Sequence, residues 1–392
     1  MKKQLVLVTG LAVLAAPAFA SKARLQALGE SVNGSQYIND NRNIFLNAAH
    51  VNNHKDLVTF ETGASSQVTD GEINSRAEGG YFTSHGNMVY GVQLGQQSDT
   101  AHALRVAGLN STTTDVAEKN TVDLFVGGDA GVKWGASLLY ASTEDKRTTA
   151  TAAAATDAKE NESMRLRLGA SQGNWDAFAN ISIANEVKLV NGDKFEGNLG
   201  YQVGGSYMLN SYTLFANYSS NAADGTVTGV KKEVSLEQME VGVGRATKLN
   251  DKTQLFTKVS YRAITAENGH VAAAGNGNNL AVKKNESTAL PVVIGLEHDA
   301  TSWLTLRGSV GQNVFINEVK GAEKNSDTST TIVNLGSTLK FGDLSVDGVI
   351  GNQSSEQVLN AAGDTVTGNT GGRRGVIDMR NLMSRVSMTY RF

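Results

Sequence analysis

Beyond position 57, apolar and polar residues alternate with a period of two, in segments of about 9–12 residues. Around Trp134, for example, Val132, Trp134, Ala136, Leu138 and Tyr140 alternate with Lys133, Gly135 and Ser137. Successive side chains of a β-strand point to opposite faces, so this period predicts strands with one apolar and one polar face. The fold class is therefore predicted to be all-β.

Two kinds of connection separate these segments, and they alternate strictly along the chain. Short connections rich in Gly, Asn, Asp and Ser, typical of tight hairpin turns, lie at 84–87, 129–131, 171–174, 209–211, 249–252, 298–302 and 341–343. Long polar connections lie at 97–119, 141–161, 185–193, 220–233, 264–286, 314–328 and 352–379. This asymmetry predicts a transmembrane antiparallel β-barrel with short periplasmic turns and long extracellular loops. With a first strand near 57–62, the seven tight turns imply about 16 strands.

The lipid environment decides which face of each strand points outward. A charge at mid-depth in the bilayer costs about 2–4 kcal/mol, so the apolar face is expected outside and the charged face inside. The inward bases are Lys133, Arg165, Arg167, Lys258, Arg262, Arg307, Arg385 and Arg391, and the inward acids are Glu78, Asp123, Glu240 and Glu297. These are the candidate pore-lining residues, because charges inside a pore set its ion preference. The alternative is that they only hold the barrel wall together.

The N-terminal 20 residues have the pattern of a cleaved export signal. Lys2 and Lys3 precede an apolar run at 5–16, and Ala18-Phe19-Ala20 is a small-x-small cleavage site. We therefore expect a signal peptide at 1–20, a periplasmic or plug segment at 21–56, and the barrel at 57–392. The expected location is the outer membrane.

The last strand ends on an aromatic residue of its apolar face. Leu382, Ser384, Val386, Met388, Tyr390 and Phe392 alternate with Met383, Arg385, Ser387, Thr389 and Arg391. This end resembles the C-terminal assembly signal of bacterial outer-membrane barrels, with Tyr390 and Phe392 as its aromatic residues. The resemblance implies the barrel assembly machinery, outer-membrane lipid and lipopolysaccharide as partners.

Composition excludes several kinds of chemistry. The chain has no cysteine and 2 prolines, and loss of Lys2 and Lys3 leaves 33 bases against 38 acids, a net charge of −5. A nucleic-acid partner is not expected from such a balance. His50 and His54 have the i,i+4 spacing of metal ligands but lack a third ligand nearby, and no Gly-x-Ser-x-Gly motif is found. No enzyme activity, metal or other cofactor is expected.

The signal, the barrel pattern and the terminal strand together resemble outer-membrane porins and porin-like major outer-membrane proteins, including a porin-like group from predatory Gram-negative bacteria. The resemblance implies passage of small solutes and a possible homo-oligomer. The Pro-Glu-Phe-type motif of the constriction loop of trimeric porins is absent from the sequence.

A second resemblance concerns 23–29 and 39–49, an Ala/Arg-rich Gly segment followed by Asn47-Ala48-Ala49. It is similar to the N-terminal hatch of the long-chain fatty-acid transporter family, without that family's Asn-Pro-Ala proline. Three functions stay open: diffusion of small hydrophilic solutes or ions, uptake of hydrophobic molecules through a hatched barrel, and a surface or adhesion role. A plug formed by 21–50 inside the lumen would favour the second.

Overall fold

The computed structural model describes residues 21–65, 76–109, 116–144, 158–271, 283–320, 324–325, 331–352 and 382–392. Helical elements are α1 (Lys22–Ala27), the 3-10 helices η1 (Asn41–Phe45) and η2 (Ala48–Asn53), and α2 (Asp99–Leu109). The strands are β1 (Leu57–Ser65), β2 (Arg76–His85), β3 (Met88–Leu94), β4 (Val122–Asp129), β5 (Lys133–Glu144), β6 (Ala158–Gln172), β7 (Trp175–Leu189), β8 (Lys194–Gly197), β9 (Gly200–Leu209), β10 (Tyr212–Val227), β11 (Val230–Asn250), β12 (Thr253–Val271), β13 (Lys283–Asp299), β14 (Leu304–Lys320), β15 (Lys324–Asn325), β16 (Ile332–Phe341), β17 (Leu344–Asn352) and β18 (Leu382–Arg391).

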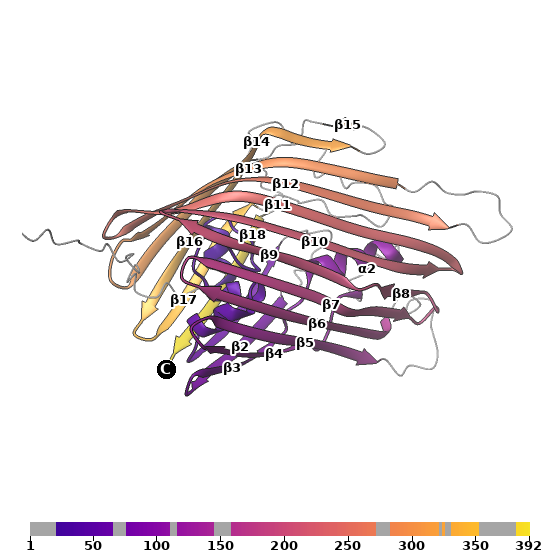
Figure 1. Ribbon diagram of the computed structural model, residues 1–392, viewed down its shortest axis with the longest axis horizontal. Coiled ribbons are helices and arrows are strands. Elements are labelled where there is room, and N and C mark those ends of the chain that lie inside the picture. Colours follow the sequence, from indigo (N-terminus) through magenta and orange to yellow (C-terminus); the bar gives the residue numbers. More distant parts are fainter. Residues whose placement is uncertain are drawn as a thin grey trace, which may run out of the picture.

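Strand pairing closes these strands into a barrel (Figure 1). β1 pairs antiparallel with β2 on one side and with β18 on the other. β8 and β9 both lie between β7 and β10 and form one interrupted strand, while β15 is a two-residue addition to β14. Taking these two from the 18 strands leaves 16 around the wall. The predicted closed antiparallel barrel of about 16 strands is confirmed.

The seven predicted tight turns all connect consecutive strands and lie at one end of the barrel, called here the turn end. At the other end, the loop end, the predicted bounds of several long connections were wrong, and β12 continues to Val271 within 264–286 and β14 to Lys320 within 314–328. The predicted connection at 185–193 is strand as far as Leu189, and the one at 220–233 is two strands joined by Thr228-Gly229. Both residues of that turn have positive φ (48° and 79°), as a two-residue hairpin turn of type I′ requires. Much of the other predicted long connections lies outside the described residues.

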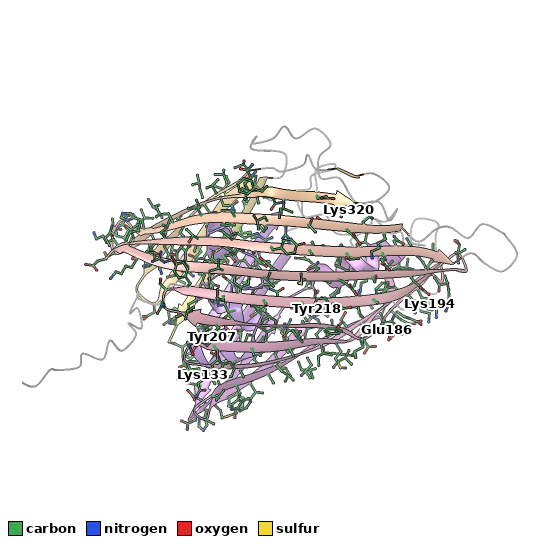
Figure 2. All side chains as sticks on the ribbon, turned by 45° about the horizontal axis from the view of Figure 1, so that its top comes forward. Lys133, Glu186, Lys194, Tyr207, Tyr218 and Lys320 are labelled. Atoms are coloured by element: carbon green, nitrogen blue, oxygen red, sulfur yellow. The ribbon has the colours of Figure 1, made fainter. Side chains whose placement is uncertain are left out.

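At bilayer depth the barrel is apolar outside and polar inside. Tyr90, Leu124, Leu138 and many other outward side chains are exposed, whereas the inward side chains of Asp123 and Ser137 are buried. A soluble barrel has the opposite arrangement, so this one is built to stand in lipid. No described helix combines the length and the apolar character that crossing a membrane requires. Figure 2 shows Lys133 and Tyr207 towards the turn end and Lys194 towards the loop end.

The wall is much taller on one side than on the other. β3 and β4 have 7 and 8 residues, whereas β11 and β12 have 21 and 19. Because about 9–11 residues of a tilted strand cross a bilayer, the long strands continue beyond it at the loop end. The outward face of β11 changes accordingly, from exposed Met239 and Val241 to exposed Glu233 and Glu237.

Candidate functional site in the barrel lumen

Residues 21–56, called here the plug, lie inside the barrel near the turn end (Figure 1, indigo). Helix α1 contacts β14, β16, β17 and β18, and η2 contacts β3 to β6 on the opposite side of the wall. Each short helix starts at a capping side chain that accepts a backbone N–H bond: Ser21 for α1, Asp40 for η1 and Asn47 for η2. Helices this short are not stable alone, so the wall must hold them in place.

Glycines on the inward face of the wall make room for the plug. Added Cβ atoms would collide with Ala48 at Gly135, with Asn47 at Gly169, with Tyr37 at Gly244 and with Ala27 at Gly336. All four lie close to the tight turns, so they form a ring at the turn end, called here the glycine seat. At these four positions the plug approaches the wall more closely than a larger residue would allow, through its backbone at Gly135 and mainly through side chains at the other three.

Two buried charge networks join the plug to the wall. In the first, Arg24 binds Asp40 at 3.0 Å within the plug and Glu297 of β13 at 3.0 Å, and Arg307 of β14 links Glu297 to Asp347 of β17. Burial by itself would lower the pKa of Arg24, but Glu297 and Asp40 raise it above its usual value. Arg24 is therefore a permanent cation, and it is shared by the plug and the wall.

The second network lies beside β1 and β2. Lys22 binds Glu78 at 2.8 Å, and Arg42 binds Glu78 and lies 3.9 Å from Glu61. Burial lowers the pKa of Lys22, as does Arg42, and the two carboxylates oppose this. Removing one partner of such a buried pair typically costs about 3–5 kcal/mol, so these contacts specify one position for the plug.

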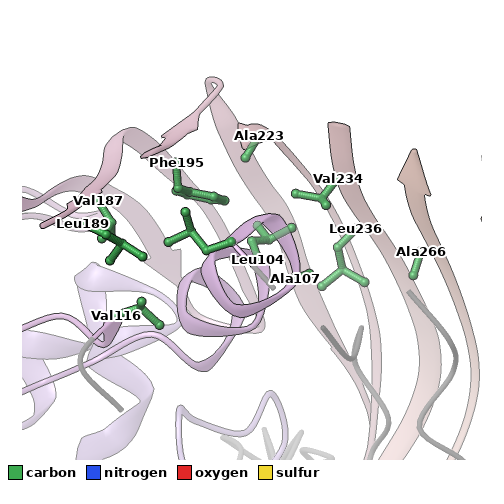
Figure 3. Close-up of a cluster of buried hydrophobic side chains, with 11 residues drawn as sticks. Leu104, Ala107, Val116, Val187, Leu189, Phe195, Ala223, Val234, Leu236 and Ala266 are labelled. Carbon is green, nitrogen blue, oxygen red and sulfur yellow. The ribbon is translucent and has the colours of Figure 1, made fainter. Parts of the chain in front are cut away.

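Helix α2 packs against one side of the inner wall at the other end of the barrel (Figure 3). Leu104 and Ala107 of α2 pack against Phe195, Val234 and Leu236 of the wall, all of them buried. Here the inner face is apolar, whereas outward Glu233 and Glu237 are exposed. The extension beyond the bilayer is therefore organised like a soluble protein, with its own apolar core, called here the cap core.

One buried side chain, Arg105, ties α2 to the wall. It is fully buried and donates to Asn185 Oδ1 at 2.6 Å, Ser163 Oγ at 2.7 Å and Asn161 Oδ1 at 2.8 Å. It also donates to the carbonyl oxygens of residues 116, 162 and 186. This helix and its anchor were missed by sequence reasoning, which treated 97–119 as a loop.

The candidate pore-lining residues lie on the inward face of the wall, and most of their charges have partners. Arg165 binds Glu118 through both nitrogens at 2.6 and 3.0 Å, and Arg167 binds Asp123 at 2.5 Å. The other described placements are Lys133 with Asn53, Lys258 with Glu30, Arg262 opposite Glu240, Arg307 with Glu297 and Asp347, and Arg385 and Arg391 on the inward face of β18. The structure brings many of these residues together with the plug or the α2 segment. That they line a conduction path stays a prediction.

The inward wall of β9 to β12 has a different chemistry. Its partly exposed inward side chains are Gln202, Asn217, Ser219, Asn221, Gln238, Glu240 and Arg262. Asn217 borders the plug and donates to Gln36 Oε1 at 3.2 Å. Of these side chains, those on β10 lie an even number of positions from the inward Phe215 and Ala223, and those on β11 an even number from the inward Val234 and Leu236, so they point into the lumen. These amide, hydroxyl and charged groups are partly accessible to solvent.

The C-terminal residues contact the start of the barrel. The ring of Phe392 stacks on Tyr81 of β2, with centroids 5.7 Å apart and planes at 8°. The Phe392 N–H donates to the carbonyl of Asp56, just before β1, and Tyr390 is exposed on the outer face. The terminal aromatic residues thus sit at the seam where β18 meets β1, and their role as an assembly signal stays a prediction.

His54, at the end of η2, is buried with neither ring nitrogen hydrogen-bonded. Burial, and secondarily His50, lowers its pKa to about 3. In the described part of the chain, no three His, Cys, Asp or Glu residues are placed to hold a metal ion. His54 is therefore a neutral imidazole enclosed in the plug.

This burial predicts that acid weakens docking of the plug. A released His54 regains a pKa near 6.5, so the docked state loses stability as pH falls below about 6.5 and continues to lose it until pH 3. Between pH 7.5 and pH 4.5, the equilibrium constant for plug docking should fall about 100-fold more in the wild type than in His54→Leu. Single-channel open probability measures this. Equal pH profiles would contradict it.

Protonation of Asp40 has the opposite effect on docking. Comparing the wild type with His54→Leu cancels this effect, because both proteins contain Asp40. Burial raises the pKa of Asp40 to about 6, so the docked state takes up this proton first and gains stability as pH falls from about 6 to 3.8. Both proteins keep Asp40, and also Arg42 and Glu61, which line the pocket around His54. The difference between the two profiles therefore belongs to His54.

Comparison with known proteins gives solved structures only. No family model matches the chain, and no curated protein matches it. The toluene transporter TbuX of Ralstonia pickettii is 13% identical, with 96% of this chain and 98% of that chain covered and a TM-score of 0.39. A porin is 13% identical (86% and 99%, TM-score 0.38), and OmpT of Vibrio cholerae 14% (86% and 97%, TM-score 0.37).

At these scores the likeness assigns no family, and the barrel is defined by its own pairing and polarity. Sixteen antiparallel strands close on themselves, with an apolar outer belt and a polar inner wall. A barrel of this size encloses a lumen rather than a solid core of wall side chains. The protein is an outer-membrane β-barrel, with a plug at one end of its lumen and an inserted helix at the other.

Proposed function

We propose that the barrel lets small hydrophilic solutes cross the outer membrane, with the plug setting the narrowest part of the path. The observation that carries this proposal is the accessible inward wall of β9 to β12, which presents amides, hydroxyls and one opposed charge pair. Such groups replace the hydrogen bonds that a polar solute gives up when it leaves bulk water.

The balance of charge also supports passage of uncharged solutes, or of ions with little selectivity between anions and cations. The inward bases alone would give the lumen a positive field and favour anions. Carboxylates lie within 3.2 Å of Arg165, Arg167 and Arg307, which balances most of that field locally. Ion selectivity is therefore expected to be weak.

Uptake of hydrophobic molecules is the second candidate, and the plug is the observation that favours it. The sequence comparison with transporter hatches anticipates a segment of this kind inside the lumen. Against it, the accessible inward wall between the plug and the cap core has few large apolar side chains, with Ile264 of β12 as one example. A continuous apolar path would be needed to guide such a molecule.

A flux assay with two solute classes tests the proposal. Proteoliposomes containing the full-length protein should swell in a pentose sugar, and the rate should fall steeply for larger oligosaccharides. Ser219→Leu with Gln238→Leu, at opposed positions of β10 and β11, should reduce sugar flux several-fold, whereas Val203→Leu on the lipid-facing side should not. Uptake of a monoaromatic hydrocarbon without sugar flux would support the second candidate. Folded protein, verified by heat-modifiable gel mobility, that passes neither solute would refute both.

A further inference from the structure

The first described residue, Ser21, lies deep inside the barrel between two wall carboxylates. It is fully buried, and its Oγ donates to Asp347 Oδ2 of β17 at 3.1 Å. The next backbone N–H, of Lys22, points at Glu61 of β1, 3.3 and 3.4 Å from its two oxygens. Three bonds separate the Ser21 nitrogen from its Oγ, so it lies about 3 Å from that atom and about 6 Å or less from Asp347.

The charges around this position do not balance. Among the described residues, the two plug networks contain the acids Asp40, Glu61, Glu78, Glu297 and Asp347 and the bases Lys22, Arg24, Arg42 and Arg307. Five acids against four bases leave one negative charge in excess. Arg385 interacts with Glu61 and with Asp99, which adds one charge of each sign and leaves the excess unchanged.

An unbalanced buried charge is costly unless one of the carboxyl groups takes up a proton, and one further cation near Asp347 and Glu61 would stabilise both carboxylates in their ionised form. While Ser21 is joined to Ala20, its nitrogen is a neutral amide and cannot be that cation. Hydrolysis of that bond adds water: the Ala20 carbonyl carbon becomes a carboxylate, and the Ser21 nitrogen becomes an amine that is largely protonated at neutral pH.

We propose that the pocket formed by Asp347 and Glu61 is a binding site for the α-ammonium of Ser21, created when a signal peptidase hydrolyses the Ala20–Ser21 bond. The plug then reaches its full docking strength only in the processed chain. The ammonium stands at the unfavourable, positive end of α1, but that effect is worth only about 0.3–1 kcal/mol. Two carboxylates at close range outweigh it.

Amine acylation of the protein purified from outer membranes tests the site directly. Intact mass should place the first residue at Ser21. At pH 7, an amine-reactive ester should modify the Ser21 nitrogen at least tenfold more slowly in the native protein than in denaturant, while exposed Lys194 reacts quickly in both. A different first residue, or equal rates in the native and denatured protein, would overturn the proposal.

Two variants distinguish slow acylation caused by the carboxylates from slow acylation caused by burial alone. Asp347→Asn and Glu61→Gln should each lower the pKa of the amine and speed its acylation about tenfold, at unchanged heat-modifiable mobility. Asp176→Asn is the control, because Asp176 contacts Ser206 and His50 and lies away from Ser21. Acylation as slow in Asp347→Asn as in the wild type would show that no ammonium is bound there. The readout does not depend on which solute the barrel transports.

Discussion

Leucine at Gly135 should displace the plug and raise single-channel conductance roughly fivefold or more, because a 16-strand barrel without its plug is an open aqueous lumen. Any Cβ at Gly135 would overlap the carbonyl group of Ala48 in η2. This obstacle is backbone and cannot rotate away like a side chain, so η2 itself must move. Planar-bilayer recording of the purified variant measures the step size.

The control is Gly348→Leu on β17. No atom lies within 4 Å of a Cβ placed at Gly348, and its strand parity points it outward, opposite to Asp347. This variant should conduct like the wild type, and both variants should keep the wild-type shift in gel mobility on heating. Unchanged conductance in folded Gly135→Leu would show that the path avoids the plug.

Replacing Arg105 with methionine should release α2 from the wall while the membrane-spanning barrel stays intact. The substitution strands the side-chain oxygens of Asn161, Ser163 and Asn185, together with three backbone carbonyls, in a buried site. At about 1–3 kcal/mol for each stranded group, docking of α2 should lose at least about 3 kcal/mol. Brief proteolysis of intact cells should then cut within 99–109.

A matched control for Arg105 is Arg245→Met. Arg245 stacks on the ring of Tyr212 near the turn end, 4.8 Å from its centroid, and takes no part in anchoring α2. It should leave the α2 segment as resistant as in the wild type. If Arg105→Met were equally resistant, the apolar contacts of the cap core alone would hold the helix.

Much of the barrel could be predicted because each feature is decided by local sequence. The tight turns follow from pairs such as Gly86-Asn87, and the outward face follows from alternation, as at Leu138 and Tyr140. Strand ends were missed near 189, 227, 271 and 320, where the polar sequence looks like loop. Beyond the bilayer the outward face of a strand becomes polar, so alternation fades although the pairing continues.

The contents of the lumen were less accessible to prediction. Capping residues such as Ser21, Asp40 and Asn47, and inward glycines recurring beside the tight turns, are signals of a docked plug in retrospect. Each is common in other contexts, since such residues also make turns and bulges. The helical period of 99–109 is short and only weakly amphipathic, so it did not stand out in a long polar segment.

The sequence by itself determined the all-β class, the number of strands, the side of the wall that each residue faces and the turn end. These depend on periods of two and on turn chemistry, which act between neighbouring residues. Only the tertiary structure decided what the inward charges do. An inward arginine fits the alternating pattern equally well whether its partner is water, Glu118 or the plug. Arg24 and Glu297 are 273 positions apart, and no local pattern specifies that pair. Closure of the barrel brings them together, and packing then selects the partner.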